Sequence, residues 1–321
     1  MTDTFLTRAA VEAREALVGR SLNYRTALDA GRPFCSKSDV ISPARVSLDV
    51  SRFLAPTMNR IASAALILIL TSSFAAAADF ASEVVEATFK LFHPSSVATC
   101  WLVRKEGEPA LCLVTAAHAL ESIKGETAII VLRRKKPDGT FERVDHTISI
   151  RREGVPRWVR HKEQDVAVLP LAEPVPTEVP AIALAALADE ARLQKAGVHV
   201  ASPLYVLTFP QRFEGNAAGF PVARSGIFAT PPLLPMRSYP TFLADFTTFA
   251  GDSGGPVFIE SADGHALIVG LAVAQNWHED RMKSEFEDRT VRHPLGMGTV
   301  LHAQFIRETF AAAAQRDDPK K

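Results

Sequence analysis

Short runs of β-branched and aromatic residues recur between turn signals, and this recurrence restricts the fold more than any other feature of the sequence. One series lies between residues 84 and 171, and a second lies between residues 198 and 302. Runs of this length and spacing are typical of an all-β barrel or sandwich and not of a helical bundle. The first series is VVEATFKLF (84–92), SVATCWLVR (96–104), LCLVTAA (111–117), TAIIVLR (127–133), VDHTISI (144–150) and VAVLPL (166–171); the second is VHVASPLYVLTF (198–209), GFPVARSGIFA (219–229), TFLADFTTF (241–249), PVFIE (256–260), ALIVGLAVAQ (266–275) and MGTVLH (297–302).

A proline-rich stretch separates the two series. Proline occurs four times between residues 170 and 180, and it interrupts strands because it cannot donate a backbone hydrogen bond. We therefore expect an N-terminal β-domain over residues 79–175 and a C-terminal β-domain over residues 197–302. The linker between them, residues 176–196, is expected to contain a short helix around Leu184–Lys195.

The last patterned segment, residues 303–315, has a helical period instead. Phe305, Ile306, Thr309 and Phe310 share one face of this segment. This pattern predicts a closing helix that packs against a barrel.

Charge and cysteine content exclude several classes of partner. The chain has 36 Lys+Arg and 36 Asp+Glu, without basic runs, which argues against nucleic acid because phosphate binding needs clustered cations. Three cysteines are too few for a four-cysteine zinc site, and the histidines show no H-E-x-x-H motif or clustered spacing. We expect neither a metal nor a cofactor.

Residues 58–78 have the order of a secretory signal. Arg60 precedes an apolar core, and small residues ending in Ala76-x-Ala78 place the cleavage before Asp79. We expect a secreted or periplasmic protein without a stable membrane span, and interpret residues 1–57 as a prefix outside the fold, with translation starting at Met58. A signal-anchor behind a genuine cytoplasmic tail is the alternative, because residues 61–78 are uncharged; only residues 64–70 are densely apolar, which favours cleavage.

Export also changes the interpretation of two cysteines. Cys100 and Cys112 lie on neighbouring runs joined by the polar segment KEGEP (105–109). If these runs form a hairpin, the two side chains could face each other within disulfide reach. Two buried thiols are the alternative, and an oxidising compartment favours the bond.

Three local motifs carry the chemistry. They are TAAH ending at His118, DVAVL starting at Asp165, and GDSGGP over residues 251–256. A serine hydroxyl is a poor nucleophile and needs a base, an imidazole can take and return the proton, and a carboxylate can orient and stabilise that imidazole. Each motif alone would be an ordinary strand histidine, turn carboxylate or glycine turn. Their coincidence favours a catalytic triad.

In this order and spacing, the motifs resemble the chymotrypsin/trypsin-like serine peptidases, over essentially residues 80–315. The resemblance implies an all-β fold of two six-stranded antiparallel β-barrels with a C-terminal α-helix, and a protein or peptide substrate. It makes Ser253 the nucleophile, His118 the general base and acid, and Asp165 the orienting carboxylate. The N–H groups of Gly251 and Ser253 would form the oxyanion hole.

The resemblance also locates the pocket for the side chain before the scissile bond. By family position its base is Thr247, and its walls are Ala274, Gln275 and the region near Gly298. None of these side chains is charged, so we expect an apolar or small residue in the pocket and no preference for Lys or Arg.

Two departures from the family pattern bear on activation and support. The sequence lacks the I-V-G-G start whose freed amine pairs with the Asp of GDSGG, so Asp252 needs another partner or solvent. We therefore predict activity without zymogen cleavage. Val273 stands where the family usually has a serine bonded to the triad carboxylate.

Two alternatives stay open. The first is a catalytically silent protease-like module that only binds, which the intact triad disfavours. The second is an α/β-hydrolase-type esterase, because GDSGG also satisfies G-x-S-x-G. That fold needs a helix directly after the serine, whereas Pro256 here leads into the strand run PVFIE.

Overall fold

A computed structural model describes residues 80–108, 110–172, 175 and 178–316. These residues all belong to one unit that spans residues 68–321. The expected prefix, the signal over residues 58–78 and the cleavage site before Asp79 lie outside the described residues. No helix within the described ranges is long and apolar enough to cross a membrane.

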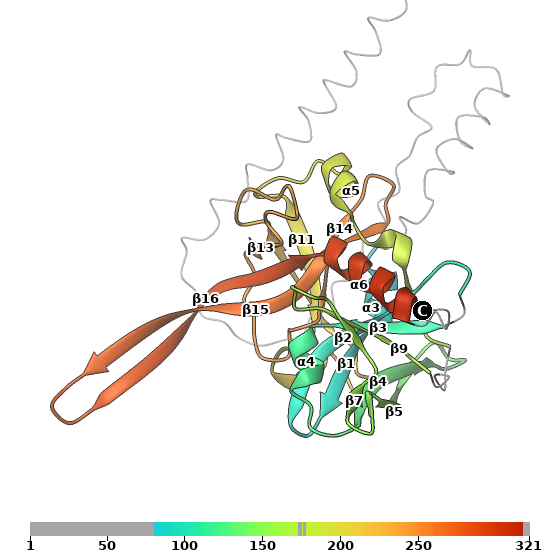
Figure 1. Ribbon diagram of the computed structural model, residues 1–321, viewed down its shortest axis with the longest axis horizontal. Coiled ribbons are helices and arrows are strands. Elements are labelled where there is room, and N and C mark those ends of the chain that lie inside the picture. Colours follow the sequence, from blue (N-terminus) through green and yellow to red (C-terminus); the bar gives the residue numbers. More distant parts are fainter. Residues whose placement is uncertain (1–79, 109, 173–174, 176–177, 317–321) are drawn as a thin grey trace, which may run out of the picture. The chain divides into compact units, whose positions relative to one another are not determined.

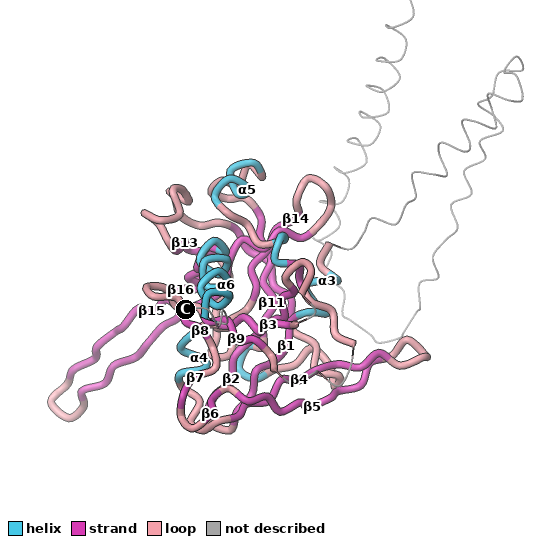
Figure 2. The backbone as a smooth tube through the Cα atoms, turned by 45° about the vertical axis from the view of Figure 1, so that its right-hand side comes forward, coloured by secondary structure: helices cyan, strands magenta, loops and turns pink. Residues whose placement is uncertain are grey.

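The first strand series forms one curled sheet of eight strands in the order β5-β4-β1-β2-β3-β9-β8, with β10 added to β2 (Figures 1 and 2). Every pairing is antiparallel except that of β10. The six predicted runs supply β1–β5 and β9, and the two-residue strands β8 and β10 are additions. The strands are β1 (Thr88–His93), β2 (Ser96–Arg104), β3 (Leu111–Thr115), β4 (Thr127–Lys135), β5 (Phe141–Ser149), β8 (Val159–Arg160), β9 (Ala167–Pro170) and β10 (Ile182–Ala183), with the hairpin β6 (Arg151–Arg152) and β7 (Val155–Pro156) beside them.

The second series forms a six-stranded antiparallel sheet in the order β12-β11-β14-β15-β16-β13. Its two edges meet, because Phe228 after β12 bridges Ala244 at the end of β13, and Ala229 donates a 2.8 Å hydrogen bond to the Leu243 carbonyl. The sheet is therefore closed into a barrel. Its strands are β11 (Pro203–Thr208), β12 (Val222–Ile227), β13 (Thr241–Ala244), β14 (Pro256–Glu260), β15 (Ala266–Lys283) and β16 (Asp288–His302).

Short helices occupy the connections. Before β1 lies α3 (Ser82–Ala87), and α4 (Ala117–Glu121) follows β3. The predicted linker helix is split into a 3-10 turn, η3 (Leu184–Ala186), and α5 (Glu190–Lys195). A second 3-10 turn, η4 (Pro210–Arg212), follows β11.

The closing helix α6 (Ala303–Arg316) joins the two sheets. It packs against β8 and β9 of the first sheet and against β15 and β16 of the second. The four residues predicted to share its inner face, Phe305, Ile306, Thr309 and Phe310, are all buried. Together the two sheets and this helix confirm the all-β, chymotrypsin-like double-barrel fold. The expected count of six antiparallel strands holds for the second sheet only, because the short strands β8 and β10 make the first sheet eight-stranded and β10 pairs in parallel.

The expected disulfide is not formed. Cys100 and Cys112 do lie on the neighbouring strands β2 and β3, but Cys112 pairs with Val103 in the register. Because side chains alternate across a strand, Cys100, three residues before Val103, points to the opposite face of the sheet. Cys100 is fully buried, and burial raises the pKa of its thiol, which makes it an inert core residue.

Strands β15 and β16 continue well beyond the barrel as a two-stranded ribbon. Figures 1 and 2 both show this ribbon projecting away from the rest of the second sheet. We call residues 276–297 the arm. The sequence predicted strands only up to Gln275 and again from Met297, so the arm is an element that pattern reasoning missed.

The last residue of β16 makes folding sensitive to acid. His302 is buried beside the Phe242 ring, and burial lowers the pKa of its imidazole to about 4. Between pH 6.5 and 4 the imidazole binds a proton in the unfolded chain but not in the folded chain. The unfolding free energy therefore falls as the pH drops through this range.

A His302→Leu variant should lack that loss. Its stability relative to wild type, measured by urea unfolding, should rise by about 3 kcal/mol over this range; a pH-independent difference would contradict the assignment.

Candidate active site

His118 and Asp165 come from separate segments of the first sheet and are in direct contact. His118 lies in α4, directly after β3, and Asp165 lies in the turn before β9. Asp165 Oδ2 is 2.5 Å from His118 Nδ1, and Oδ1 accepts a 2.9 Å hydrogen bond from the His118 amide. The carboxylate therefore fixes both the ring and the backbone of the histidine, and Nε2 is the ring nitrogen that can exchange a proton with another group.

Contact between His118 and Asp165 shifts the pKa of each. The hydrogen bond that His118 donates to Asp165 raises the pKa of His118 above its ordinary value, although partial burial opposes this. Burial alone would raise the pKa of Asp165, but the hydrogen bonds from the His118 ring and amide outweigh it and lower that pKa. The side chains are about half and one third exposed, so solvent can reach both. Such a pair is a charged orienting group beside an accessible base.

Ser253 lies on a loop that is attached to both sheets. Its carbonyl accepts a 2.9 Å hydrogen bond from the amide of Thr99 in β2, and the next amide, of Gly254, donates a 2.8 Å bond to Ala272 in β15. Thr115, three residues before His118, also reaches this region, since its hydroxyl bonds the Thr99 carbonyl at 2.8 Å. The loop thus lies at the seam of the sheets, beside the end of β3 that leads to His118. No hydrogen bond joins the Ser253 hydroxyl to His118 in the described chain.

Thr99 holds the loop with its side chain as well. Its hydroxyl donates to the Gly251 carbonyl at 2.8 Å and accepts a 3.1 Å bond from the Phe209 amide. The carbonyls of Gly251 and Ser253 are therefore both occupied by one residue. In the described ranges, neither the Gly251 nor the Ser253 N–H donates to a backbone carbonyl, which leaves two donors for an external oxyanion. Nothing in the sequence distinguished Thr99 from other strand threonines.

Two glycines of the loop are required by its shape. Gly251 and Gly254 have φ values of +98° and +93°, a region that side chains disfavour. A Cβ atom on Gly254 would lie 2.0 Å from the Thr99 carbonyl oxygen and 2.3 Å from the Thr115 hydroxyl. The loop can approach β2 this closely only because glycine occupies that position.

The family model for the trypsin-like peptidase domain matches residues 98–271, more than half of the chain. The chain belongs to the trypsin-like peptidase family. No curated protein matches the chain. The matched range includes all three motifs and ends within β15, just before the arm.

The trypsin-like domain supplies a partner for Asp252 from within its own barrel. Arg224 in β12 places Nη2 2.7 Å from Asp252 Oδ2, which also accepts a 2.7 Å bond from the Phe249 amide. The Asp252 side chain is only 3% exposed. The same guanidinium bonds the Thr208 hydroxyl and the Thr247 carbonyl, so it anchors the segment that leads into the loop of Ser253.

The residues predicted for the specificity pocket lie on three neighbouring segments. Gln275 and Gly298 are register partners in β15 and β16, and the Gln275 side chain donates to the Thr248 carbonyl. Thr247 is exposed, whereas the side chain of the next residue, Thr248, is buried and would meet a Cβ atom on Gly298 at 2.7 Å. Thr248, which family position did not indicate, therefore packs directly beside Gly298.

Ala274 and Val273 lie at an irregularity of the same strand. Ala274 pairs with Thr299, while Ala272 pairs with Val300, so Val273 is the extra residue of a bulge in β15. The contacts to Asp165 come from His118, as described above. The Asp165 carboxylate is thus held by the ring and amide of His118, and position 273 supplies no serine to it.

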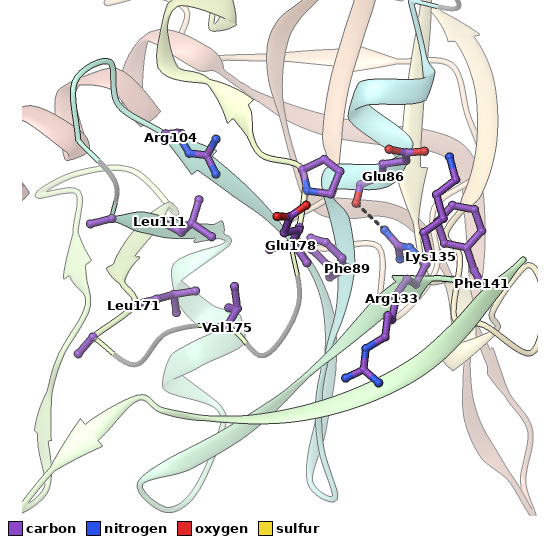
Figure 3. A pocket seen from close by; sticks show the side chains of 15 residues that line it. Glu86, Phe89, Arg104, Leu111, Arg133, Lys135, Phe141, Leu171, Val175 and Glu178 are labelled. Atoms are coloured by element: carbon purple, nitrogen blue, oxygen red, sulfur yellow. Dashed lines mark hydrogen bonds between the residues drawn. The ribbon is translucent and has the colours of Figure 1, made fainter. Parts of the chain in front are cut away.

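A large cavity lies elsewhere, in the first sheet and the linker. It encloses about 1170 Å³ and includes none of the predicted catalytic residues. Figure 3 shows Phe89, Leu171 and Val175 around it, with charged side chains such as Arg104 and Lys135. Among the described residues, no group of three or more His, Cys, Asp or Glu side chains is placed to hold a metal ion.

Breaking the buried ion pair should destabilise the domain. An Arg224→Met variant leaves the Asp252 carboxylate buried without its cation, and we expect a loss of about 3–5 kcal/mol in unfolding free energy by urea titration. The double variant Arg224→Met/Asp252→Asn should recover much of this loss because it removes the unpaired charge. Equal stability of Arg224→Met and wild type would show that the pair does not support the loop.

Proposed function

We propose that this trypsin-like domain is a serine endopeptidase that hydrolyses peptide bonds through an acyl-enzyme intermediate. The observation that carries the proposal is the contact of Asp165 with both the ring and the amide of His118, beside a loop that presents Ser253 and two N–H donors. The family match independently supports a protease.

The reaction follows from the roles of these groups. His118 Nε2 accepts the Ser253 hydroxyl proton while Oγ bonds to the scissile carbonyl carbon, and the resulting oxyanion is stabilised by the Gly251 and Ser253 N–H groups. The imidazolium then gives its proton to the leaving amine, and the peptide bond breaks. Water, deprotonated by the same histidine, then attacks the acyl carbon. The C–Oγ bond breaks as the imidazolium returns its proton to Ser253 Oγ, which frees the acid product.

The proposal also covers which substrate residue is preferred, where the protein is exported and how it becomes active. The uncharged lining formed by Thr248, Gln275 and Gly298, with Thr247 and Ala274 beside it, favours an apolar or small residue before the scissile bond. Arg224 already neutralises Asp252, so the domain needs no freed N-terminal amine and is active without zymogen cleavage. Secretion or transfer to the periplasm is supported by the signal-like sequence over residues 58–78.

The competing function is a protease-like module that binds but does not cleave. The absence of a Ser253–His118 hydrogen bond is compatible with it, yet catalytic hydrogen bonds are often long before substrate binds. The esterase alternative is disfavoured, because Ser253 is followed by β14 and not by a helix.

A covalent probe separates the two functions. A fluorophosphonate should label wild type at Ser253, and Ser253→Ala should not react. Ser284→Ala, at an exposed serine in the turn of the arm, should be labelled at the wild-type rate and is the matched control. A folded wild-type protein that resists labelling would favour the binding module.

The pH dependence reports the His118–Asp165 pair. Because Asp165 raises the pKa of His118, kcat/KM should rise with pH through an inflection above 6.5, as the imidazole becomes neutral and competent as a base. Asp165→Asn should move the inflection downward and lower kcat by about 10⁴-fold.

Glu121→Gln is the control for this experiment. Glu121 also raises the pKa of His118, but more weakly and without touching the ring. Its variant should shift the inflection slightly and retain most of kcat. An inflection that is the same in wild type and Asp165→Asn would show that the carboxylate does not act on the base.

A further inference from the structure

The loop between β11 and β12, residues 209–221, leaves the second sheet and lies against the first. Near its end, the Gly219 carbonyl accepts a 2.9 Å hydrogen bond from the buried guanidinium of Arg133 in β4. The Phe220 ring lies edge-on to the ring of Phe141 in β5, with the ring centres 5.0 Å apart. A loop of the second sheet is therefore fastened to strands of the first.

The beginning of the same loop binds the peptide group that supplies one of the proposed oxyanion donors. Gln211 donates its amide hydrogen to the Ala250 carbonyl at 2.7 Å. That carbonyl and the Gly251 N–H belong to one peptide unit, which is trans, because the cis bonds of the described chain all precede prolines. In a trans peptide the C=O and the N–H point in opposite directions. The bond from Gln211 therefore keeps the Gly251 N–H turned away from the loop and available to an oxyanion.

The turn that carries Gln211 has an unfavourable backbone conformation. Gln211 and Arg212 have φ values of +50° and +68°, in the left-handed region that residues with a side chain seldom adopt. Such conformations persist only where surrounding contacts fix them. Without those contacts the turn would relax, and the Gln211 amide would change direction. The contacts that oppose this relaxation therefore also decide where the Gly251 N–H points.

A buried lysine of the first sheet supplies such contacts. Lys90 in β1 is only 7% exposed, and its Nζ donates to the Arg212 carbonyl at 2.9 Å and to Glu214 Oε1 at 2.6 Å. Glu214 Oε2 lies 2.5 Å from Nη1 of Arg143 in β5. Burial would raise the pKa of Glu214, but the hydrogen bonds from Lys90 and Arg143 outweigh it and lower that pKa. We call Lys90, Glu214 and Arg143 the clamp.

We propose that the clamp holds the turn at Gln211 and Arg212 and thereby aims the Gly251 N–H at the reacting carbonyl oxygen. This inference rests on the proposed function. It makes Lys90 and Glu214 positioning residues, which act on the reaction only through the turn. Lys90 lies before residues 98–271, so the range that the family model matches does not include it.

The first test removes the cation of the clamp while keeping a side chain of similar length. In Lys90→Met, kcat should fall by about tenfold or more while KM changes by less than about twofold, because the oxyanion exists only in the transition state. Loss of a whole oxyanion donor costs about 10²–10³-fold in kcat, which is the upper bound. The inflection of kcat/KM with pH should stay at its wild-type position, because the His118–Asp165 pair is untouched.

A second variant and a matched control accompany this test. Glu214→Gln keeps an acceptor for Lys90 and should lower kcat in the same way but by less. The double variant Lys90→Met/Glu214→Gln should lose less than the product of the two single effects, because both act through one turn. Arg134→Met breaks the 2.8 Å bridge to Glu142 between β4 and β5 of the same sheet. Among the described residues Arg134 makes no hydrogen bond or ion pair with residues 209–221, and its variant should keep the wild-type kcat.

Hydrogen exchange separates this inference from the proposed function, because it needs no catalysis. In the Ser253→Ala variant, the Gln211 amide should exchange about tenfold faster when Lys90→Met is added and at an unchanged rate when Arg134→Met is added. If wild type cleaves no peptide while Lys90 still governs this exchange, proteolysis fails and the hold of the clamp on the turn stands.

The outcomes that overturn the proposal are equally specific. An active enzyme in which Lys90→Met leaves kcat unchanged, or changes only KM, would show that the clamp does not position the oxyanion donor. A fall in kcat with unchanged exchange of the Gln211 amide would show that Lys90 does not act through the turn. If urea unfolding shows that Lys90→Met is not folded under the assay conditions, Glu214→Gln decides by the same two measurements.

Discussion

One threonine holds the candidate active site together, because Thr99 of the first sheet binds the Ser253 loop of the second sheet. Its amide bonds the Ser253 carbonyl, and its hydroxyl bonds the Gly251 carbonyl and the Phe209 amide. If the two sheets slid against each other, His118 on one would be separated from Ser253 on the other. A set of short backbone bonds across the seam opposes such sliding, and Gly254 lets the loop come close enough to form them.

A second constraint acts from beneath the loop. The Arg224–Asp252 pair is buried, and a buried pair stabilises a conformation only when both charges are present and well bonded. Arg224 bonds Asp252, the Thr208 hydroxyl and the Thr247 carbonyl at once, while its Nε and Asp252 Oδ1 have no hydrogen-bond partner in the described chain. The loop is therefore held by contacts within the second sheet as well as by Thr99 of the first.

What could be predicted from the sequence depends on how far apart along the chain the interacting residues lie. The runs of β-branched and aromatic residues between turn signals were enough to predict the strands, and Phe305 with Phe310 predicted the buried face of α6, because these patterns are local. The cysteine pairing failed because the register of β2 against β3 places Cys112 opposite Val103, and a register is set across the sheet. Arg224 and Thr99 could not be found from local pattern, since each acts on a residue far away in the chain.

The arm was not predicted from the sequence for a different reason. Its sequence is rich in charge and reads as a loop, yet the charges are arranged so that partners meet across or along the strands, as in Glu279–Arg292 and Arg281–Asp288. Asp280 lies between His278 and His293 at 2.9 and 3.2 Å. Pairing of this kind lets a ribbon persist without a hydrophobic core, because cross-strand pairs are the unit of sheet stabilisation.

The same charges also decide what an exposed edge of the arm can accept. An exposed strand edge normally invites another sheet, and charged side chains along it are a common protection against such aggregation. Arg281 and Lys283 would meet like charges on an identical arm laid edge to edge in register, which disfavours that arrangement. The charges of the arm therefore disfavour pairing of its exposed edge with another sheet.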